Sequence, residues 1–191
     1  MSIVLQGSTS GSVTLQEPAI AGTTVLDLPA VSGTILTTGS SGQSIPKAAL
    51  PTGSVLQVVN FGTTTQTSTT SASGVTTAIT ASITPTSSSS KILITAFANG
   101  VQKNSGNSAS GVILWLYKGA SNLQRLGEYI AYTNSSQTND VGTAAIDYLD
   151  SPATTSSVTY TIYIASNVSG QTVFVNAGGD YSTITLMEIA A

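Results

Sequence analysis

The sequence contains neither cysteine nor histidine among its 191 residues. Without cysteine no disulfide can form, so stability outside a cell would depend on packing and oligomerisation. Without either residue, the chain also lacks the thiolate and imidazole groups that act as nucleophiles, as general bases and as the usual ligands of zinc. Catalysis by carboxylates alone, or no catalysis, is what remains open.

Acidic residues are few, and one close pair of them could suggest a hydrolase. A glycosidase needs two carboxylates at a suitable separation, and Asp147 and Asp150 in "AIDYLDSP" are the nearest pair. However, Asp150-Ser151-Pro152 is typical of a turn that ends a strand, where Asp is favoured for its hydrogen bonds to the backbone. Because no EF-hand-like calcium loop is present either, we expect no enzyme activity, no cofactor and no metal site. The acids are Glu17, Asp27, Glu128, Asp140, Asp147, Asp150, Asp180 and Glu188.

Charge of either sign is scarce. Charged residues make up 7% of the chain, against about 25% in ordinary soluble domains. The five basic residues are spread thinly and the net charge is -3, so the clustered positive surface of a nucleic-acid-binding protein is missing. No apolar run approaches the roughly 18 residues of a membrane span, and the N-terminus lacks a signal-peptide pattern. We expect no nucleic-acid partner, no membrane insertion, and a protein made and kept in a cytoplasm until it is released.

Hydrophobic residues, in contrast, are plentiful at 40% of the chain. This content is enough for a real core and argues against disorder. Low charge provides little repulsion to keep copies of the chain apart. Self-association is therefore expected.

The N-terminal segment contains a short sequence repeat in two copies. Gly11, Gly22 and Gly33 recur every eleven residues, and each unit is an apolar run, a Pro-Ala pair and a Gly, which predicts a strand, a bend and a restart. So small a unit cannot cover its own apolar face, so it stacks in a solenoid, wraps around identical units of other chains, or lies as an extended arm on a partner. Two copies are too few for a solenoid, and we favour wrapping. The candidate residues for the anchor and trimer interface are Val13, Leu15, Val25, Leu26, Leu28, Ile35 and Leu36.

The rest of the sequence predicts a linker followed by an all-β head domain. We place the β-repeat anchor at residues 1–38, a Gly/Ser/Pro linker at 39–53 and a jelly-roll β-sandwich at 54–191. Nine runs of β-branched and aromatic residues, separated by Gly, Pro, Asn or Ser clusters, predict its strands. The predicted strands are 54–61, 74–83, 91–99, 111–118, 123–132, 142–149, 157–165, 171–176 and 181–189. The hydroxyl-rich stretch 63–74 is interpreted as a solvated connection.

Two of the predicted strands are apolar on both faces. In "KILITAFAN" the residues Leu93 and Phe97 oppose a second apolar set, and in "GVILWLYK" the same holds for Ile113, Trp115 and Tyr117. In a two-layer sandwich one face of each sheet meets water, so the second apolar face needs cover from outside the domain. A neighbouring subunit would supply that cover; the alternative is that loops of the same chain do.

Aromatic residues leave a second function open. Their flat apolar faces with polar edges can stack on sugar rings, as a receptor-binding adhesin would require. Packing in the core and at interfaces explains them equally well, and we favour packing. The residues are Trp115, Tyr117, Tyr129, Tyr132, Tyr148, Tyr160, Tyr163 and Tyr181.

The amino-acid sequence also resembles that of a known group of proteins. "GSVTLQEPAIAGTTVLDLPAVSGTILTTG" is similar to segments of tail-fibre and other virion structural proteins of bacteriophages, especially aquatic ones. "LPTGSVLQVV", "ITASITPTSSSSKILI", "YLDSPATTSSVTYTIYI" and "STITLMEIAA" are similar to their terminal domains. The resemblance implies a homotrimeric head of tumour-necrosis-factor-like jelly rolls on an interwoven N-terminal stalk, without enzyme activity.

The expected function is therefore that of a homotrimeric phage virion protein. Its first 50 residues could reach no further than about 170 Å, and such a short anchor with one knob suits capsid decoration, as a cement protein, rather than a long fibre. The partners would be its own copies and other virion proteins, such as the major capsid protein or tail proteins. The alternative is a short tail fibre or adhesin that recognises host surface polysaccharide.

Overall fold

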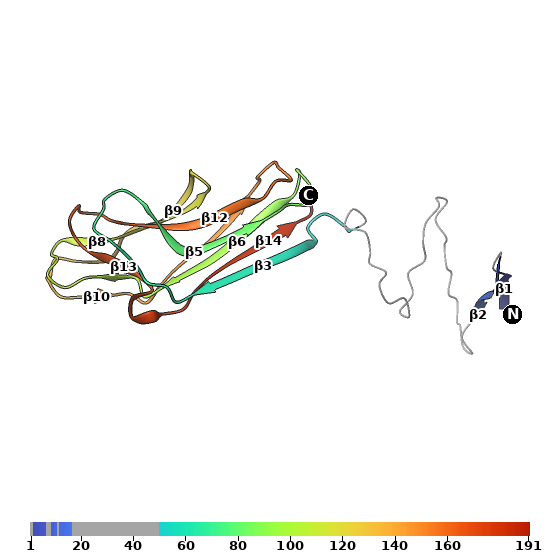
Figure 1. The fold of residues 1–191 in the computed structure, drawn as a ribbon, viewed down its shortest axis with the longest axis horizontal. Helices are drawn as coiled ribbons and strands as arrows, with labels where there is room; N and C mark the ends of the chain where they lie inside the picture. The colour runs from blue at the N-terminus through green and yellow to red at the C-terminus, as the bar shows by residue number, and fades with distance from the viewer. Residues whose placement is uncertain (1, 7–8, 11, 17–49) are drawn as a thin grey trace. The chain divides into compact units, whose positions relative to one another are not determined.

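A computed structural model describes residues 2–6, 9–10, 12–16 and 50–191 (Figure 1). The chain divides into two compact units, Met1–Ser44 and Ile45–Ala191, and each is described by itself. In the first unit, β1 (Ser2–Gln6) pairs antiparallel with β2 (Ser12–Gln16). The predicted anchor residues Val13 and Leu15 belong to β2. The other anchor residues lie outside the described residues: Val25, Leu26, Leu28, Ile35 and Leu36. The anchor and its boundaries stay predictions.

Eight long strands of the second unit form two four-stranded antiparallel sheets, with the orders β11-β6-β14-β3 and β5-β12-β8-β9. Their pairing is nested: β3 pairs with β14, β5 with β12, β6 with β11, and β8 with β9. A long hairpin rolled into two sheets has this pattern, which is that of a jelly roll. The bounds are β3 Val55–Thr63, β5 Val75–Ile83, β6 Lys91–Asn99, β8 Ser110–Lys118, β9 Ser121–Thr133, β11 Thr143–Asp150, β12 Val158–Ser166 and β14 Ser182–Ile189.

A third antiparallel sheet, of short strands, has the order β10-β7-β13-β4. It lies at the end of the sandwich away from the C-terminus (Figure 1). Its members are β4 Thr67–Thr69, β7 Gln102–Lys103, β10 Asn139–Asp140 and β13 Val173–Val175, and a 3-10 turn, η2 Ala177–Gly179, follows β13. The all-β sandwich is therefore confirmed, but two sheets were expected for the head and three are present within residues 50–191. The stretch 63–74, interpreted as a solvated connection, contributes β4 because its threonines pair with β13.

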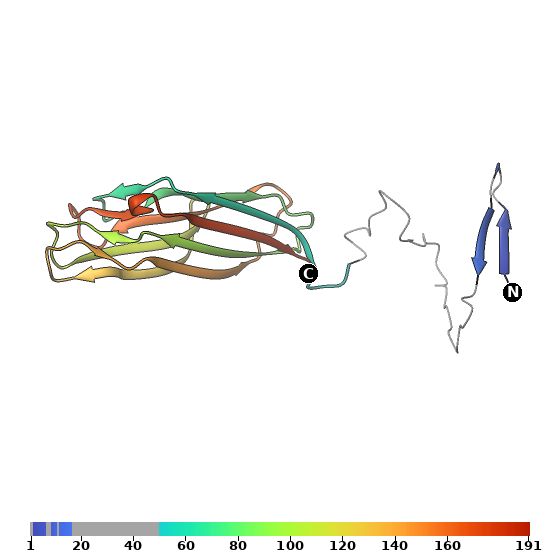
Figure 2. The ribbon, with the colours of Figure 1, turned by 90° about the horizontal axis from the view of Figure 1, so that it is seen from below.

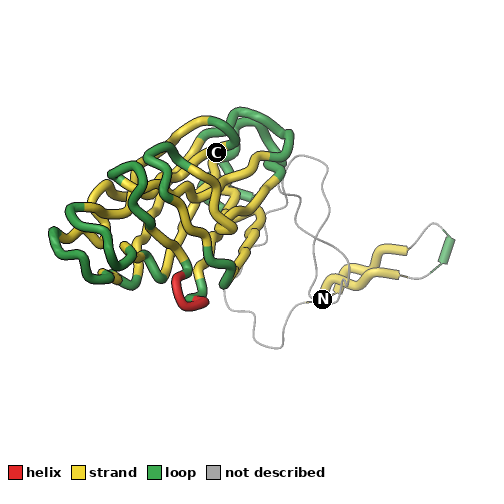
Figure 3. The backbone as a smooth tube through the Cα atoms, turned by 60° about the vertical axis from the view of Figure 1, so that its left-hand side comes forward, coloured by secondary structure: helices red, strands yellow, loops and turns green. Residues whose placement is uncertain are grey.

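The core lies between the two large sheets, whose long strands run side by side along the unit (Figures 2 and 3). Alternation along each strand decides which residues enter it, since successive side chains point to opposite faces. In β6, Ile92 and Ile94 are fully buried, and in β14 Ile184 and Leu186 are as well. Burial of each such side chain stabilises the fold by about 1.5–3 kcal/mol. Because these alternate residues are buried, the residues between them in the same strands face outward.

Candidate assembly surface

The outward face of the sheet β11-β6-β14-β3 carries a row of apolar side chains across all its strands. Leu149 of β11 pairs in register with Leu93 of β6, which pairs with Met187 of β14, which pairs with Val58 of β3. Residues on one face of neighbouring strands lie about 4.5–5.5 Å apart at their Cβ atoms, so the row is continuous. At its ends the row is open to solvent, because Leu149 is 52% exposed and Val58 56%. We call these four residues the apolar row.

Polar residues border the apolar row on one side. Asp147, Thr95, Thr185 and Asn60 pair in register across the four strands, and Asn60 Nδ2 donates a 2.7 Å hydrogen bond to Thr185 Oγ1. An apolar surface rimmed by polar groups is typical of a protein interaction site.

On its other side the apolar row continues into Ile189 and Val55, which pair with each other. Val55 is 50% exposed, and Lys91 lies beside Ile189 in β6. The paired strands therefore present much apolar surface and little charge on this face. Such a face can meet a second surface without a large loss of hydration energy.

The outward face of the other large sheet is closed to a greater extent by the chain itself. Ile113 of β8 is 8% exposed and Ala165 of β12 is fully buried. Tyr117 and Tyr163 stack with ring centroids 4.0 Å apart, and Gly74 lies against Tyr163 and Trp115. The sequence predicted an external cover for both doubly apolar strands. For β8 the alternative, cover by the chain itself, holds for Ile113, whereas Trp115 and Tyr117 remain partly exposed. For β6, Phe97 remains 44% exposed. Cover by a neighbouring subunit stays a prediction.

Asp147 and Asp150, the nearest acidic pair in sequence, point to opposite faces of β11. Asp147 is exposed on the outward face, whereas Asp150 is 7% exposed and points inward. The odd spacing along a strand explains the separation. They are therefore not brought together as the carboxylate pair of a glycosidase.

Asp150 instead links the two large sheets. It accepts hydrogen bonds from Lys118 Nζ, 2.8 Å from Oδ2, and from the hydroxyl of Tyr160 at 2.7 Å. Burial raises the pKa of the Tyr160 hydroxyl, and its hydrogen bond to Asp150 and the charge of that carboxylate raise it further. The phenol therefore stays protonated and keeps donating. The role of this acid is structural.

Glu188 is a second buried acid, and it accepts several hydrogen bonds. It is fully buried on the inward face of β14, and it accepts from Gln57 Nε2 at 2.6 Å, from the Thr86 amide at 2.6 Å and from the Thr86 hydroxyl at 2.7 Å. Burial raises the pKa of this carboxyl, but hydrogen bonds from Thr86, Ser90 and Gln57 together outweigh it, so the pKa lies below its usual value. The alternation in "STITLMEI" could have identified Glu188 as inward-facing, because it shares a face with Ile184 and Leu186.

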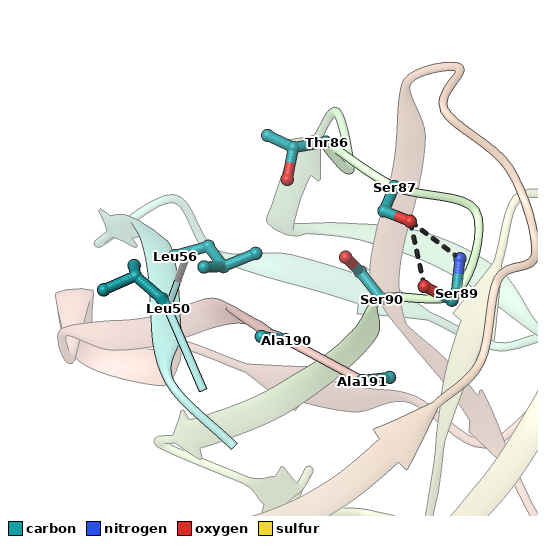
Figure 4. A pocket seen from close by; sticks show the side chains of 8 residues that line it. All are labelled: Leu50, Leu56, Thr86, Ser87, Ser89, Ser90, Ala190 and Ala191. Atoms are coloured by element: carbon teal, nitrogen blue, oxygen red, sulfur yellow. Dashed lines mark hydrogen bonds between the residues drawn. The ribbon is translucent and has the colours of Figure 1, made fainter. Parts of the chain in front are cut away.

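A hollow of about 400 Å³ lies beside Glu188, at the end of the sandwich that contains the C-terminus (Figure 4). Apolar groups and hydroxyls line it, and Ser87 bonds to Ser89 through their hydroxyls at 2.9 Å. Its lining carries no ionisable side chain, and nothing in it selects a ligand. The lining residues are Leu50, Leu56, Thr86, Ser87, Ser89, Ser90, Ala190 and Ala191.

A second hollow, of about 290 Å³, lies at the opposite end of β14. It is formed by Asn99, Gly142, Thr143, Asp180 and Tyr181, and its lining combines a carboxylate, an amide, a hydroxyl and an aromatic ring. Sequence reasoning named Asp180 among the acids and Tyr181 among the aromatic residues, but it did not place either of them beside Asn99 or Thr143. These residues belong to segments that are far apart in sequence, so no local signal could have linked them.

The tyrosines divide between packing and exposure. Tyr160 is fully buried, whereas Tyr129 is 62% and Tyr181 57% exposed. Tyr129 and Tyr132 meet edge to face on β9, with centroids 5.5 Å apart. Packing therefore explains part of the set, and exposed tyrosine rings remain on β9 and immediately before β14.

Within the described ranges, no helix is long and apolar enough to cross a membrane. Among the same residues, no three side chains of His, Cys, Asp or Glu are grouped in a way that could hold a metal ion.

Comparison with known proteins found distant similarity only. No protein-family model matches the chain, and no curated protein does. Among solved structures, the chain is similar to the VP2 subviral particle of infectious bursal disease virus, with 12% identity, a TM-score of 0.39 and coverage of 72% of this chain and 34% of that one. A mutant VP2 of that virus in derived T=1 particles matches with 14% identity, a TM-score of 0.36 and coverage of 95% and 43%.

The structure of the Gt strain of the same virus matches with 14% identity, a TM-score of 0.33 and coverage of 98% of this chain and 46% of that one. The chain thus spans less than half the length of these viral proteins.

Proposed function

We propose that this chain is a non-enzymatic structural protein of a bacteriophage virion that assembles as a homotrimer. Residues 1–50 dock on the particle, and residues 51–191, which contain the sandwich, are displayed outward. The role that fits best is capsid decoration, as a cement protein that is assembled onto the virion in the host cytoplasm. The partners are further copies of this chain and other virion proteins, such as the major capsid protein or a tail protein.

The observation that carries the proposal is the apolar row. A monomer in water would leave Leu149 and Val58 half exposed, and each Å² of apolar surface removed from water contributes about 25 cal/mol. The face around the row has few charges, with Asp147 and Lys91 on either side of it. A surface of this kind suits a permanent contact between copies, because obligate interfaces resemble a divided core.

Three-fold assembly would also suit the anchor. A closed symmetric oligomer presents identical docking segments around one axis, so that one protein can occupy a symmetric site on a shell. The sequence repeat at residues 11–33 supports this arrangement, because its units carry apolar residues that only neighbouring units can bury. The resemblance of the sequence to phage virion proteins supports the location.

Light scattering tests the self-association. The full chain should have the mass of three 19.2 kDa subunits, and Val58→Asp or Leu149→Asp should reduce the mass to one subunit because each places a charge in the apolar row. Asn122→Asp is the matched control, since it adds the same charge at an exposed position of β9 in the other sheet. A wild-type chain that remains a folded monomer at micromolar concentration would contradict the proposal.

Virion incorporation tests the docking segment. Val25→Asp and Leu28→Asp should each reduce incorporation into particles while the circular dichroism of the head stays that of a β-sandwich. Normal incorporation of both variants would count against docking through residues 1–50. Imaging of intact particles distinguishes a place on the capsid from one on the tail.

A second candidate function, a short tail fibre or adhesin, is favoured by one observation. The hollow of Asn99, Gly142, Thr143, Asp180 and Tyr181 combines polar groups with an exposed ring. A soluble head that binds extracted host polysaccharide would support this role, which a decoration protein does not need.

A further inference from the structure

The hollow at the start of β14 brings together segments that are far apart in sequence. Asn99 ends β6, Gly142 and Thr143 lie at the start of β11, and Asp180 and Tyr181 precede β14. Its volume is about 290 Å³, close to the lower bound of about 300 Å³ for small-molecule sites.

The amide of Asn99 is held in a fixed orientation. Its Nδ2 donates to the Tyr181 carbonyl oxygen at 2.5 Å, and its Oδ1 accepts from the Thr143 hydroxyl at 2.6 Å. The Asn99 backbone amide donates to the Ser182 hydroxyl at 2.8 Å. A primary amide has two hydrogens and two lone pairs, so one donor and one acceptor remain available after these bonds. The polar back of the hollow is thus preorganised.

Asp180 supplies a carboxylate with unused acceptor capacity. It is exposed, and among residues 50–191 no ion pair or hydrogen bond engages its side-chain oxygens. Gly100 makes room for it, because a Cβ on Gly100 would lie 3.0 Å from Asp180 Oδ2. The carboxylate can therefore accept hydrogen bonds from a hydroxylated ligand.

Tyr181 is the aromatic residue that lines the hollow, and Phe97 lies on the same outward face. Tyr181 is 57% exposed, and Phe97 is 44% exposed. Phe97 pairs with Thr183, which pairs with Gly62, and the far end of the Tyr181 ring lies over Gly62, where a Cβ would be 1.8 Å from Oη. Both rings therefore lie along one row of the outward face. Gly62 is the residue that permits this position of the tyrosine.

We propose that this hollow is a subsite for an uncharged sugar ring. Tyr181 stacks on the apolar face of the ring, while Asp180 and the Asn99 amide bond to neighbouring hydroxyls. The carboxylate repels an acidic sugar such as a uronic acid, because no basic side chain lines the hollow. The proposal rests on the second candidate function, the adhesin, and names its ligand class; it does not depend on assembly, since trimer formation through the apolar row does not require Asp180 or Tyr181.

Saturation-transfer NMR on the full chain tests the proposal. The probes are methyl glucoside, methyl galactoside, N-acetylglucosamine and glucuronate at millimolar concentration. We expect transfer to at least one neutral sugar and markedly less to glucuronate. Asp180→Ala and Tyr181→Ala should each weaken binding about tenfold, because each removes a major contact of the ring. Gly62→Ala, which displaces the ring and leaves the polar groups unchanged, should weaken binding as well.

Two matched controls distinguish the hollow from general surface effects. Tyr129→Ala removes a similarly exposed tyrosine from the other large sheet. Asp147→Ala removes an exposed acid from the polar residues that border the apolar row. Both variants should bind sugar as the wild type does. The proposal is overturned if no neutral sugar binds, if glucuronate binds as well as the neutral sugars, or if Asp180→Ala and Tyr181→Ala bind like the wild type. None of these results changes the expected trimer mass, so the two proposals fail separately.

Discussion

The hydroxyl of Tyr160 in β12 donates to the carboxylate of Asp150 in β11 at a distance of 2.7 Å, and so joins the two sheets of the sandwich from within. Lys118 in β8 bonds to the same carboxylate. A buried carboxylate left without these donors would be strongly disfavoured, so the three residues are expected to depend on one another.

Tyr160→Phe should lower the free energy of unfolding by about 1.5–3 kcal/mol, the usual contribution of a hydrogen bond to a charged group. The ring volume is kept, so the loss reports the hydroxyl alone. Urea denaturation measures it. The single variant Asp150→Asn and the double variant complete a double-mutant cycle. If the two losses in free energy of unfolding are additive, Tyr160 and Asp150 are not coupled.

The same tyrosine should influence stability at high pH. The pKa of Tyr160 is raised in the folded state, so its stabilising contribution is complete below the unfolded value of about 10 and is lost as pH rises above it. The advantage of the wild type over Tyr160→Phe in thermal melting should therefore shrink above about pH 10. An advantage that stays constant at alkaline pH would argue against a protonated, buried phenol.

Glu188 should make the protein sensitive to acid. Its folded pKa lies below the usual value, so its contribution to stability is complete above the unfolded pKa of about 4.3 and is lost as pH falls towards the folded one. The difference in melting temperature between the wild type and Glu188→Gln should be greatest near neutral pH and should narrow below about pH 4. The other acids titrate in both proteins, so their effects cancel in this difference. A difference in melting temperature that does not change with pH would contradict the lowered pKa of Glu188.

Substitutions in one strand pair should separate folding from association. Ile94→Ala empties a fully buried position and should reduce the stability of the head by about 2–5 kcal/mol. Leu149→Ala alters a residue that is 52% exposed, so the folded head should lose less, while the trimer should dissociate at a higher protein concentration. Denaturation and light scattering on both variants test this contrast. Equal effects on folding would mean that Leu149 is part of the core.

Gly100 and Gly178 form a matched pair for backbone strain. Both have positive φ, at 56° and 70°, so alanine at either position should cost about 1 kcal/mol or more. A Cβ on Gly100 would also lie 2.6 Å from the backbone nitrogen of Ala177, whereas nothing lies within 4 Å at Gly178. Gly100→Ala should therefore destabilise the head clearly more than Gly178→Ala does in thermal melting. Similar losses would contradict the close approach.

Much of the head could be predicted from local pattern. The alternation in "KILITAFAN" predicted two apolar faces, and the structure buries Ile92 and Ile94 of one of them, because the side chains of a strand alternate with a period of two. The same pattern identified Leu93 and Phe97 as a second apolar face. The short strands β4, β7 and β10 were missed, since segments of two or three residues carry too little pattern to be recognised.

The sequence by itself thus determined the class of the fold, the exclusion of thiol and imidazole chemistry, and which residues of each long strand share a face, since these follow from composition and from the geometry of a single strand. The tertiary structure alone decided which faces meet. It separated Asp147 from Asp150, aligned Leu149, Leu93, Met187 and Val58 across four strands, and placed Asp180 beside Asn99. Such juxtapositions depend on register and on long-range strand pairing, which the residues next to each position do not encode.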